Sequence, residues 1–236
     1  MKLHRFYVEQ NLPKEGIFSI HHQGLFSQIK KVLRLLPNEK VGLFNGNSQE
    51  YISKIVSSGN KNEIVFQIEE IQKNDVSLNK EVSLFFSILK KDNVEWIIQK
   101  GTELGVSNFI PIISARSEKK NINIDRINKI TIEATEQSGR PVPPTIKEIT
   151  KLESIFDSFH EPIIVFEKGS EPFKKEDFEN AIKVGILIGP EGGWTKEEIS
   201  LFKNRKATFR SLGSTTLRGE TAAIVASALF LQCPTL

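Results

Sequence analysis

Residues 184–198 read VGILIGPEGGWTKEE, and this stretch decides the fold because it joins an apolar run to a glycine-rich turn and a helix start. The apolar run 184–188 is typical of a strand that is buried on both faces of a parallel sheet. The next six residues contain three glycines, which favour a tight turn. Thr195 and Glu198 have the spacing of a capping box, in which two side chains close the first turn of a helix. The stretch therefore predicts the strand, turn and helix of an α/β fold.

The same alternation of strands and helices continues on both sides of this stretch. Apolar runs predict further strands at Val82–Leu89, Val106–Ile113, Pro162–Phe166 and Thr208–Leu212. Spacing and cap residues predict helices that start at Asp92 or Asn93 and end at Gly105, run from Asp125 to before Gly139, and run from Gly219 to Leu231. We expect residues 76–236 to form one α/β domain with a mostly parallel sheet.

The first 75 residues have a different pattern, with short strands joined by tight turns. The pattern predicts strands at Leu3–Val8, Val41–Phe44, Tyr51–Val56 and Ile64–Ile71, and one helix over about 22–34. Short strands with turn clusters between them are typical of a small β-barrel. The polar stretch 72–80 is the expected linker, so the sequence predicts a first domain at 1–75 and a second at 76–236.

Composition limits the classes of function that the chain can have. Of 236 residues, 39% are hydrophobic and 26% are charged, and the net charge of +3 permits a nucleic-acid partner without requiring one. Cys233 is the single cysteine, which excludes an intramolecular disulfide and a multi-cysteine metal cluster. No apolar run approaches the ~20 residues of a membrane span. We expect a cytoplasmic protein that binds neither metal nor membrane.

Three loops leave the carboxyl ends of predicted strands, at 166–169, 189–193 and 212–218, where ligands bind in open parallel sheets. The glycines of the second loop fit neither a Walker loop nor a dinucleotide-binding fingerprint. The carboxylate of Glu191 would also repel a phosphate group. A ligand with a cationic centre, or an adenosine bound by backbone groups, is compatible with this loop. The alternative is a tight turn that binds nothing.

Several segments in and around these loops share their order and spacing with one known family. They are 186–194 (ILIGPEGGW), 211–213 (SLG), 217–223 (LRGETAA), 100–106 (KGTELGV), 133–140 (EATEQSGR), 4–8 (HRFYV) and 32–35 (VLRL). On these residues the chain resembles the RsmE family of 16S ribosomal RNA (uracil-N3)-methyltransferases, over nearly its whole length. One departure is the run 21–26 (HHQGLF), after which the VLR motif arrives later than in relatives.

The resemblance implies a SPOUT-type catalytic domain with a trefoil knot, preceded by a PUA-like β-barrel domain that binds RNA. It also implies a homodimer that transfers a methyl group from S-adenosyl-L-methionine to N3 of a uridine in the 16S rRNA of the small ribosomal subunit. The residues that it implies for binding the methyl donor are Phe166, Glu167, Ile188, Gly189, Pro190, Glu191, Gly192, Gly193, Leu212, Gly213 and Leu217.

Arg218 and Glu220 are the candidate catalytic residues, at the junction between the third loop and the last helix. Methylation at N3 of uracil requires loss of a proton, and an arginine near O2 or O4 would stabilise the resulting anion. A nearby carboxylate could accept the proton, which makes Glu220 a candidate base. The alternative is structural, with Glu220 favouring the helix N-terminus and Arg218 in solvent.

Six basic residues are candidates for contacting RNA: Arg5, Lys30, Lys31, Arg34, Arg116 and Arg140. For Arg140 the alternative is a favourable position at a helix end. The helix over 219–231 is apolar almost all round, so it is expected to be buried, either in the domain core or at a dimer interface. Two rival functions remain open: a SPOUT ribose 2′-O-methyltransferase, and an RNA-binding assembly factor without catalysis.

Overall fold

The computed structural model describes the chain except for residues 1–2, 60–61, 75, 77–79, 175–180 and 233–236. It divides into two compact units, the first made of Met1–Ser77 with Thr135–Val142 and the second of Leu78–Ala134 with Pro143–Leu236. The segment Thr135–Val142, from the middle of the chain, was not part of the predicted division at residue 75. Much of the predicted linker 72–80 lies outside the described residues, and Gln72 and Lys73 belong to the last strand of the first unit.

The second unit is built on a parallel sheet, as predicted. Its strands lie in the order β12-β10-β11-β6-β7-β8, and every pairing along this path is parallel. The strands are β6 (Glu81–Ser87), β7 (Asn108–Ile113), β8 (Thr145–Ile146), β9 (Thr150–Lys151, paired with β7), β10 (Ile163–Phe166), β11 (Lys183–Ile188) and β12 (Thr208–Arg210). The two-residue strands β8 and β9 are too short to give a sequence pattern.

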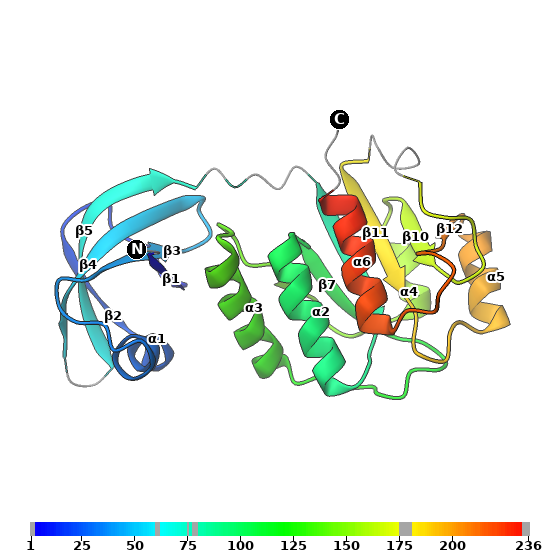
Figure 1. Cartoon of the computed structure of the whole chain (residues 1–236), viewed down its shortest axis with the longest axis horizontal. Coiled ribbons are helices and arrows are strands. Elements are labelled where there is room, and N and C mark those ends of the chain that lie inside the picture. Colours follow the sequence, from blue (N-terminus) through cyan, green and yellow to red (C-terminus); the bar gives the residue numbers. More distant parts are fainter. Residues whose placement is uncertain (1–2, 60–61, 75, 77–79, 175–180, 233–236) are drawn as a thin grey trace. The chain divides into compact units, whose positions relative to one another are not determined.

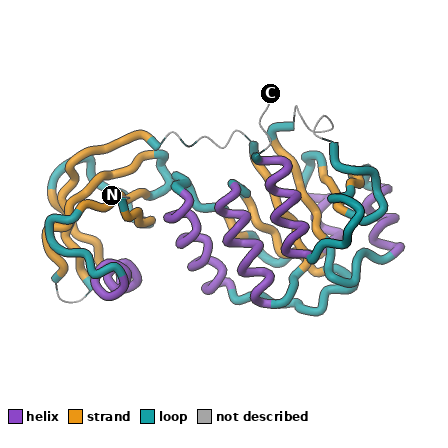
Figure 2. The backbone as a smooth tube through the Cα atoms, viewed as in Figure 1, coloured by secondary structure: helices purple, strands orange, loops and turns teal. Residues whose placement is uncertain are grey.

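Helices cover both faces of this sheet (Figures 1 and 2). On one face lie α2 (Lys91–Leu104), α3 (Ile124–Ser138) and α6 (Gly219–Leu231), and on the other α4 (Leu152–Ser158) and α5 (Lys196–Asn204). Successive residues of β6 point to opposite cores: Leu84 and Phe86 pack with the first set of helices, and Phe85 packs with the second. The apolar runs are therefore strands buried on both faces, as predicted.

Side-chain caps explain where two helices begin. The predicted capping box of α5 is confirmed, because Thr195 Oγ1 accepts from the Glu198 amide and the Glu198 carboxylate accepts from the Thr195 amide. Asn123, rather than Asp125, supplies the cap oxygen of α3, accepting from the Arg126 amide at 3.0 Å. The α2 helix ends at Gly105 in the left-handed conformation, with φ +113°, as predicted.

The first unit is a five-stranded sheet in the order β1-β3-β4-β5-β2, in which β1 and β3 are parallel and the other pairs antiparallel. Among the described residues no backbone pairing joins β1 to β2, so hydrogen bonds do not close the expected barrel there. The predicted helix is split into a short α-helix and one turn of π-helix. The elements are β1 (His4–Tyr7), β2 (Ile17–His21), α1 (Gln23–Ser27), η1 (Gln28–Val32), β3 (Lys40–Phe44), β4 (Gln49–Ser58) and β5 (Glu63–Lys73).

Arg5 and Glu136 join the segment Thr135–Val142 to the strands of the first unit. The Arg5 guanidinium forms an ion pair with Glu50 at 2.8 Å. It also donates to the backbone oxygens of Thr135, Glu136 and Arg140, at the carbonyl end of a helix, where backbone oxygens lack intrahelical partners. The Glu136 carboxylate accepts from the Tyr7 amide at 3.0 Å and from the Gln28 side chain at 3.1 Å. Arg5 therefore acts within the fold.

No helix in the described part of the chain is both long and apolar enough to span a lipid bilayer.

Replacement of Gly101 by alanine tests the packing of α2 on the sheet. A Cβ atom at Gly101 would lie 2.7 Å from the ring of Phe109, which is fully buried. Alanine at an ordinary helix position stabilises by about 0.5–1 kcal/mol relative to glycine, whereas overpacking costs about 1–3 kcal/mol. We therefore expect Gly101→Ala to lower the free energy of unfolding, as measured by denaturant titration. An increase would show that Phe109 can move aside.

Candidate active site

The three predicted loops meet around one cavity of about 370 Å³ in the second unit. They meet because Phe166, at the end of β10, lies opposite both Ile188, at the end of β11, and Arg210, at the end of β12. Ten of the eleven residues implied for the methyl donor line this cavity, the exception being Gly192. The complete lining is Phe166, Glu167, Lys168, Ile188, Gly189, Pro190, Glu191, Gly193, Trp194, Leu212, Gly213, Thr215, Thr216, Leu217, Arg218, Gly219 and Ala222.

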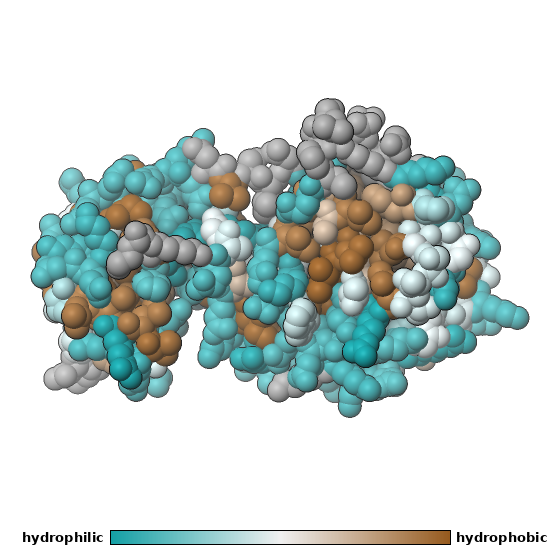
Figure 3. Space-filling model, in the orientation of Figure 1, coloured by the Kyte–Doolittle hydropathy of each residue, from teal (hydrophilic) through white to brown (hydrophobic). Residues whose placement is uncertain are grey.

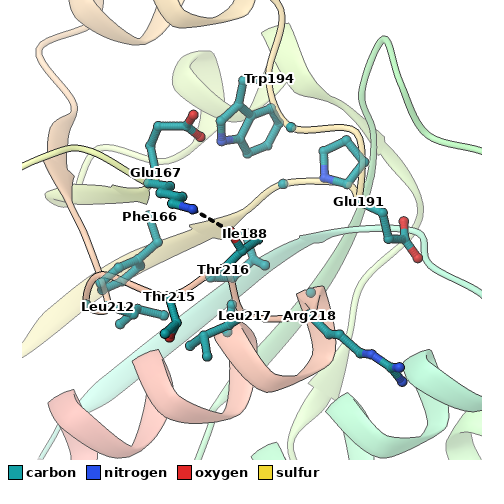
Figure 4. A pocket seen from close by; sticks show the side chains of 17 residues that line it. Phe166, Glu167, Ile188, Glu191, Trp194, Leu212, Thr215, Thr216, Leu217 and Arg218 are labelled. Atoms are coloured by element: carbon teal, nitrogen blue, oxygen red, sulfur yellow. Dashed lines mark hydrogen bonds between the residues drawn. The ribbon is translucent and has the colours of Figure 1, made fainter.

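The cavity wall combines an apolar side with two carboxylates (Figure 4). Phe166, Ile188, Leu212 and Leu217 provide aromatic and aliphatic surface, and Glu167 and Glu191 provide negative charge. Burial raises the pKa of the Glu167 carboxyl above its usual range, because the charged form loses hydration. A ligand with a positive charge would offset that cost, whereas a phosphate would add to it.

A hydrogen bond connects the first loop to the third across the cavity. Lys168 Nζ donates to Thr216 Oγ1 at 2.7 Å, as the dashed line in Figure 4 shows. Neither residue was predicted to bind the methyl donor or to act in catalysis. Both residues lie in loops that were predicted to meet. The sequence therefore located them near the site, but it did not predict the hydrogen bond between them.

Trp194 fixes the conformation of the glycine-rich loop. Its side chain is buried and packs edge-on against Phe202, with ring centroids 5.0 Å apart. A Cβ atom at Gly189 would lie 2.8 Å from the Trp194 ring, so glycine is required there by the indole. The close packing of the indole on the backbone is thus the constraint that the structure shows for this glycine. In the described part of the chain, Trp194 Nε1 is buried without a hydrogen-bond partner at the cavity wall.

Arg116 holds the same loop from the end of β7. Its Nη1 donates to the backbone oxygen of Gly192 at 2.6 Å and to that of Trp194 at 3.4 Å. Its aliphatic carbons pack against Gly192, where an added Cβ would lie 3.3 Å from Arg116 Cδ. Arg116 therefore supports the glycine-rich loop through its guanidinium, and its predicted contact with RNA stays a prediction.

Glu198 gives the loop a second attachment to the end of β7. Its buried carboxylate accepts from the Ala115 amide at 2.8 Å and from the Thr195 amide at 2.7 Å. The neighbouring Ser114 hydroxyl contacts those of Ser87, at 3.1 Å, and Ser117, at 2.8 Å. Hydrogen bonds therefore connect the end of β6 to the residues just after β7, and those residues to the start of α5.

The two candidate catalytic residues have different positions. Arg218 lines the cavity and is the N-cap residue of α6, and Figure 4 shows its side chain directed away from the other labelled side chains, toward the ribbon of α2. Glu220 is not among the residues that line the cavity. Its Oε2 atom is buried and has no hydrogen-bond partner in the described residues. The geometry thus favours Arg218 and gives no support to Glu220 as the base.

The candidate RNA-binding residues of the first unit also fall into two groups. Lys30, Lys31 and Arg34 are exposed in and just after η1. In contrast, the Arg5 side chain is 11% exposed and Arg140 is 4% exposed. Burial lowers the pKa of Arg140 to about 10, which leaves it charged at neutral pH. The expectation that Arg5 and Arg140 contact RNA is therefore corrected: both are buried within the first unit.

Among the described residues no group of three or more His, Cys, Asp or Glu side chains could hold a metal ion. The Nδ1 atom of His22 instead accepts from the Leu25 amide at 3.0 Å and caps α1.

Replacement of Arg116 by alanine distinguishes loop support from RNA binding. Without the two bonds from Nη1 the glycine-rich loop gains alternative conformations, so binding of the implied donor S-adenosylmethionine should weaken about tenfold, or about 1.4 kcal/mol. Titration calorimetry without RNA measures this. Arg205→Ala is the matched control, because Arg205 is also exposed and bonds Asp157 instead. Unchanged donor affinity in Arg116→Ala would contradict the assigned role.

Two protein-family profiles match this chain, one in each unit. The profile of the RNA methyltransferase domain matches residues 76–231, and that of the RNA methyltransferase PUA domain matches residues 29–69. Curated relatives include ribosomal RNA small subunit methyltransferase E from Rickettsia conorii, 32% identical over 97% of this chain and 95% of the relative. The protein of the same name from Aquifex aeolicus is 31% identical over 94% of this chain and 96% of the relative.

Solved structures show the same relationship. Ribosomal RNA small subunit methyltransferase E from Neisseria gonorrhoeae, bound to S-adenosyl methionine, superposes with a TM-score of 0.87 at 26% identity and 96% coverage of both chains. A Legionella pneumophila protein in complex with the cofactor SAM gives a TM-score of 0.89 at 26% identity and 97% coverage of both chains. With profile matches to both units and relatives that align over almost the full length, the chain belongs to the ribosomal RNA small subunit methyltransferase E family.

Proposed function

We propose that this protein transfers a methyl group from S-adenosylmethionine to N3 of a uridine in the 16S rRNA of the small ribosomal subunit. The observation that carries the proposal is the cavity between the ends of β10, β11 and β12, in a chain of the methyltransferase E family. The N3 position and the uridine come from the resemblance to the RsmE family. Because the proposed substrate is rRNA, we also propose that the protein is cytoplasmic.

The cavity residues fit the proposed donor in size and charge. The volume of about 370 Å³ lies within the range of pockets that bind small molecules. Phe166, Leu212 and Leu217 provide apolar surface for an adenosine, and Glu167 and Glu191 provide negative charge for a cationic ligand. The Trp194 indole N–H is a buried donor that an acceptor on the ligand or a water could satisfy. When bound, S-adenosylmethionine supplies an electrophilic methyl group on a sulfonium.

The chain's own contribution to the chemistry is electrostatic. Uracil N3 has a pKa about two units above neutrality, so its ionisation at pH 7 costs ~3 kcal/mol. The Arg218 guanidinium, donating to O2 or O4, would stabilise the negative charge as it develops. The N3–C bond then forms as the C–S bond breaks, with the reacting atoms in line, and no covalent enzyme intermediate is needed. The proton from N3 leaves to solvent, because Glu220 does not line the cavity.

A SPOUT-type trefoil knot and a homodimer are also part of the proposal. The third loop, after β12, and the α6 helix that follows it both contribute to the cavity, as expected if the C-terminal segment threads into place there. Ile224, Val225 and Leu229 of α6 are only partly buried in the single chain. Figure 3 shows apolar surface gathered over this helix, which suits a two-fold interface.

The first unit is proposed to bind the rRNA with the surface around η1. Lys30, Lys31 and Arg34 are exposed there, beside Val32, which is 72% exposed. Cations of this kind contact phosphate groups and position the RNA without reading its sequence. Arg5 and Arg140 hold the fold of the unit and are not part of this surface.

The proposed activity is tested by nucleoside mass spectrometry of 16S rRNA from cells with and without the gene. We expect 3-methyluridine at one position to disappear in the deletion and to return with the wild-type gene. Loss of a 2′-O-methyl nucleoside instead would favour the ribose methyltransferase. An unchanged nucleoside profile, together with purified protein that does not bind S-adenosylmethionine, would favour a non-catalytic assembly factor.

Replacement of Arg218 by alanine tests the chemistry. Loss of one preorganised donor to a developing anion costs about 100-fold in rate, so single-turnover methyl transfer should fall by about that factor. Donor affinity should change little. Arg218→Lys should restore only part of the rate, because an ammonium does not reproduce the planar guanidinium.

Arg205→Ala is again the control. Near-normal transfer by a well-folded Arg218→Ala variant would remove this residue from the chemistry. A rate that falls only in proportion to the unfolded fraction would assign it a structural role.

A further inference from the structure

Lys168 is a cation at the mouth of the donor cavity, and its hydrogen-bond partner is a neutral group. Its Nζ atom donates to Thr216 Oγ1 at 2.7 Å, and both residues are exposed (Figure 4). Lys168 forms no ion pair with any other residue that the structure describes. A lysine ammonium has three N–H donors, of which Thr216 uses one. The charge of Lys168 is therefore available to an anionic group of a ligand.

The charged residues around the cavity do not suit all parts of S-adenosylmethionine equally. This donor carries a sulfonium, an ammonium and one carboxylate. Glu167 and Glu191 line the cavity and suit the two positive groups, but they would repel the carboxylate. Among the described lining residues the cations are Lys168 and Arg218, and the Arg218 side chain is directed away from the other labelled side chains (Figure 4). Lys168 is therefore the cation that is placed to meet the carboxylate.

The exposure of the lining residues indicates how the donor is oriented in the cavity. Phe166 is buried and Leu212 and Leu217 are half-buried, whereas Lys168 and Thr216 are exposed. The apolar surface suits the adenosine. The exposed side suits the amino-acid part, because a charge that is buried without a partner is costly. This orientation directs the carboxylate of the donor toward the side of the cavity on which Lys168 lies.

We propose that Lys168 binds the carboxylate of S-adenosylmethionine and so selects a donor that carries an intact amino acid. This inference rests on the proposed function, since it assigns one group of the proposed donor to one residue. When the donor binds, Lys168 Nζ exchanges the Thr216 hydroxyl for a carboxylate oxygen. The exchange costs little, because Thr216 is exposed and water can replace the lysine, and it adds the attraction between opposite charges.

Two other roles of Lys168 lead to different results. If its bond to Thr216 only joins the two loops, loss of the lysine would weaken every ligand of the cavity by the same factor. If its ammonium contacts a phosphate of the rRNA, loss of the lysine would not change the affinity for the donor when RNA is absent.

Decarboxylated S-adenosylmethionine separates these roles, because it keeps the adenosine, the sulfonium and the ammonium and lacks only the carboxylate. Its affinity and that of S-adenosylmethionine are measured by titration calorimetry of the full-length protein without RNA. We expect Lys168→Gln to weaken S-adenosylmethionine by about tenfold, as for loss of a hydrogen bond to a charged group. The decarboxylated ligand should bind as well as to wild type, or more tightly because a repelling cation is gone, which also shows that the site is intact.

Three further variants serve as controls. Lys174 is exposed and lies between β10 and β11, as Lys168 does, but it does not line the cavity, so Lys174→Gln should change neither affinity. Thr216→Val removes the link between the loops and keeps the ammonium, so the preference for S-adenosylmethionine over the decarboxylated ligand should persist. Lys168→Arg should retain most of that preference, because it retains the positive charge.

Equal weakening of both ligands in Lys168→Gln would overturn the proposal and leave Lys168 as a link between loops. Unchanged affinity for both ligands would also overturn it, and a raised KM for small subunits would then assign Lys168 to the rRNA. In either case methyl transfer by the wild-type protein would leave the proposed function standing. If the wild-type protein does not bind S-adenosylmethionine at all, the proposed function fails together with the role of Lys168.

Discussion

The position of the candidate active site depends on the register of three parallel strands. At their ends Phe166 of β10 lies opposite Ile188 of β11 on one side and Arg210 of β12 on the other. Parallel neighbours that end at one level release their loops at one edge of the sheet, so segments distant in the sequence meet without a dedicated scaffold. The register is itself maintained by burial on both faces, because a slip of one residue would exchange the two cores. The geometry of the site therefore depends on the packing of apolar side chains in the two cores.

The loops at that edge are then held by side chains from outside them. Arg116 and Glu198 bond the glycine-rich loop and the start of α5 to the end of β7, and Lys168 connects the first loop to the third. The bonds from Arg116 and Glu198 use backbone oxygens and amides, which would otherwise need water or a ligand. A loop that is already ordered loses less conformational entropy when it binds a ligand.

The sequence predicted the main strands and helices because apolar periodicity and caps are local signals. The capping box at Thr195 and the glycine at Gly105 were found in this way. The split of one helix into α1 and η1 was missed, because a π-helical turn has nearly the same spacing of apolar residues. The strand β8 has only two residues, which is too few to show a periodic pattern of apolar residues.

Charged residues were harder to interpret than apolar ones. Arg116 was predicted to contact RNA because it follows a strand end, and Arg140 because Pro141 stiffens the loop in which it stands. In the structure Arg5 and Arg116 bond backbone oxygens far away in the sequence and Arg140 is buried, and these partners left no local signal. The donor loops could be located from the sequence because they follow strands, but the reason for Gly189 needed the position of the Trp194 ring.

That ring also has an optical consequence. The chain contains two tryptophans, and they report on different surroundings, since Trp96 is 55% exposed whereas Trp194 is 5% exposed. Emission from a buried indole lies at shorter wavelength than emission from a hydrated one, so the two tryptophans emit around different wavelengths. Because Trp194 forms part of the cavity wall and has an N–H without a partner among the described residues, a molecule that enters the cavity alters the surroundings of this fluorophore directly. The protein thus contains an intrinsic reporter of occupancy, and its site can be followed in solution without a label.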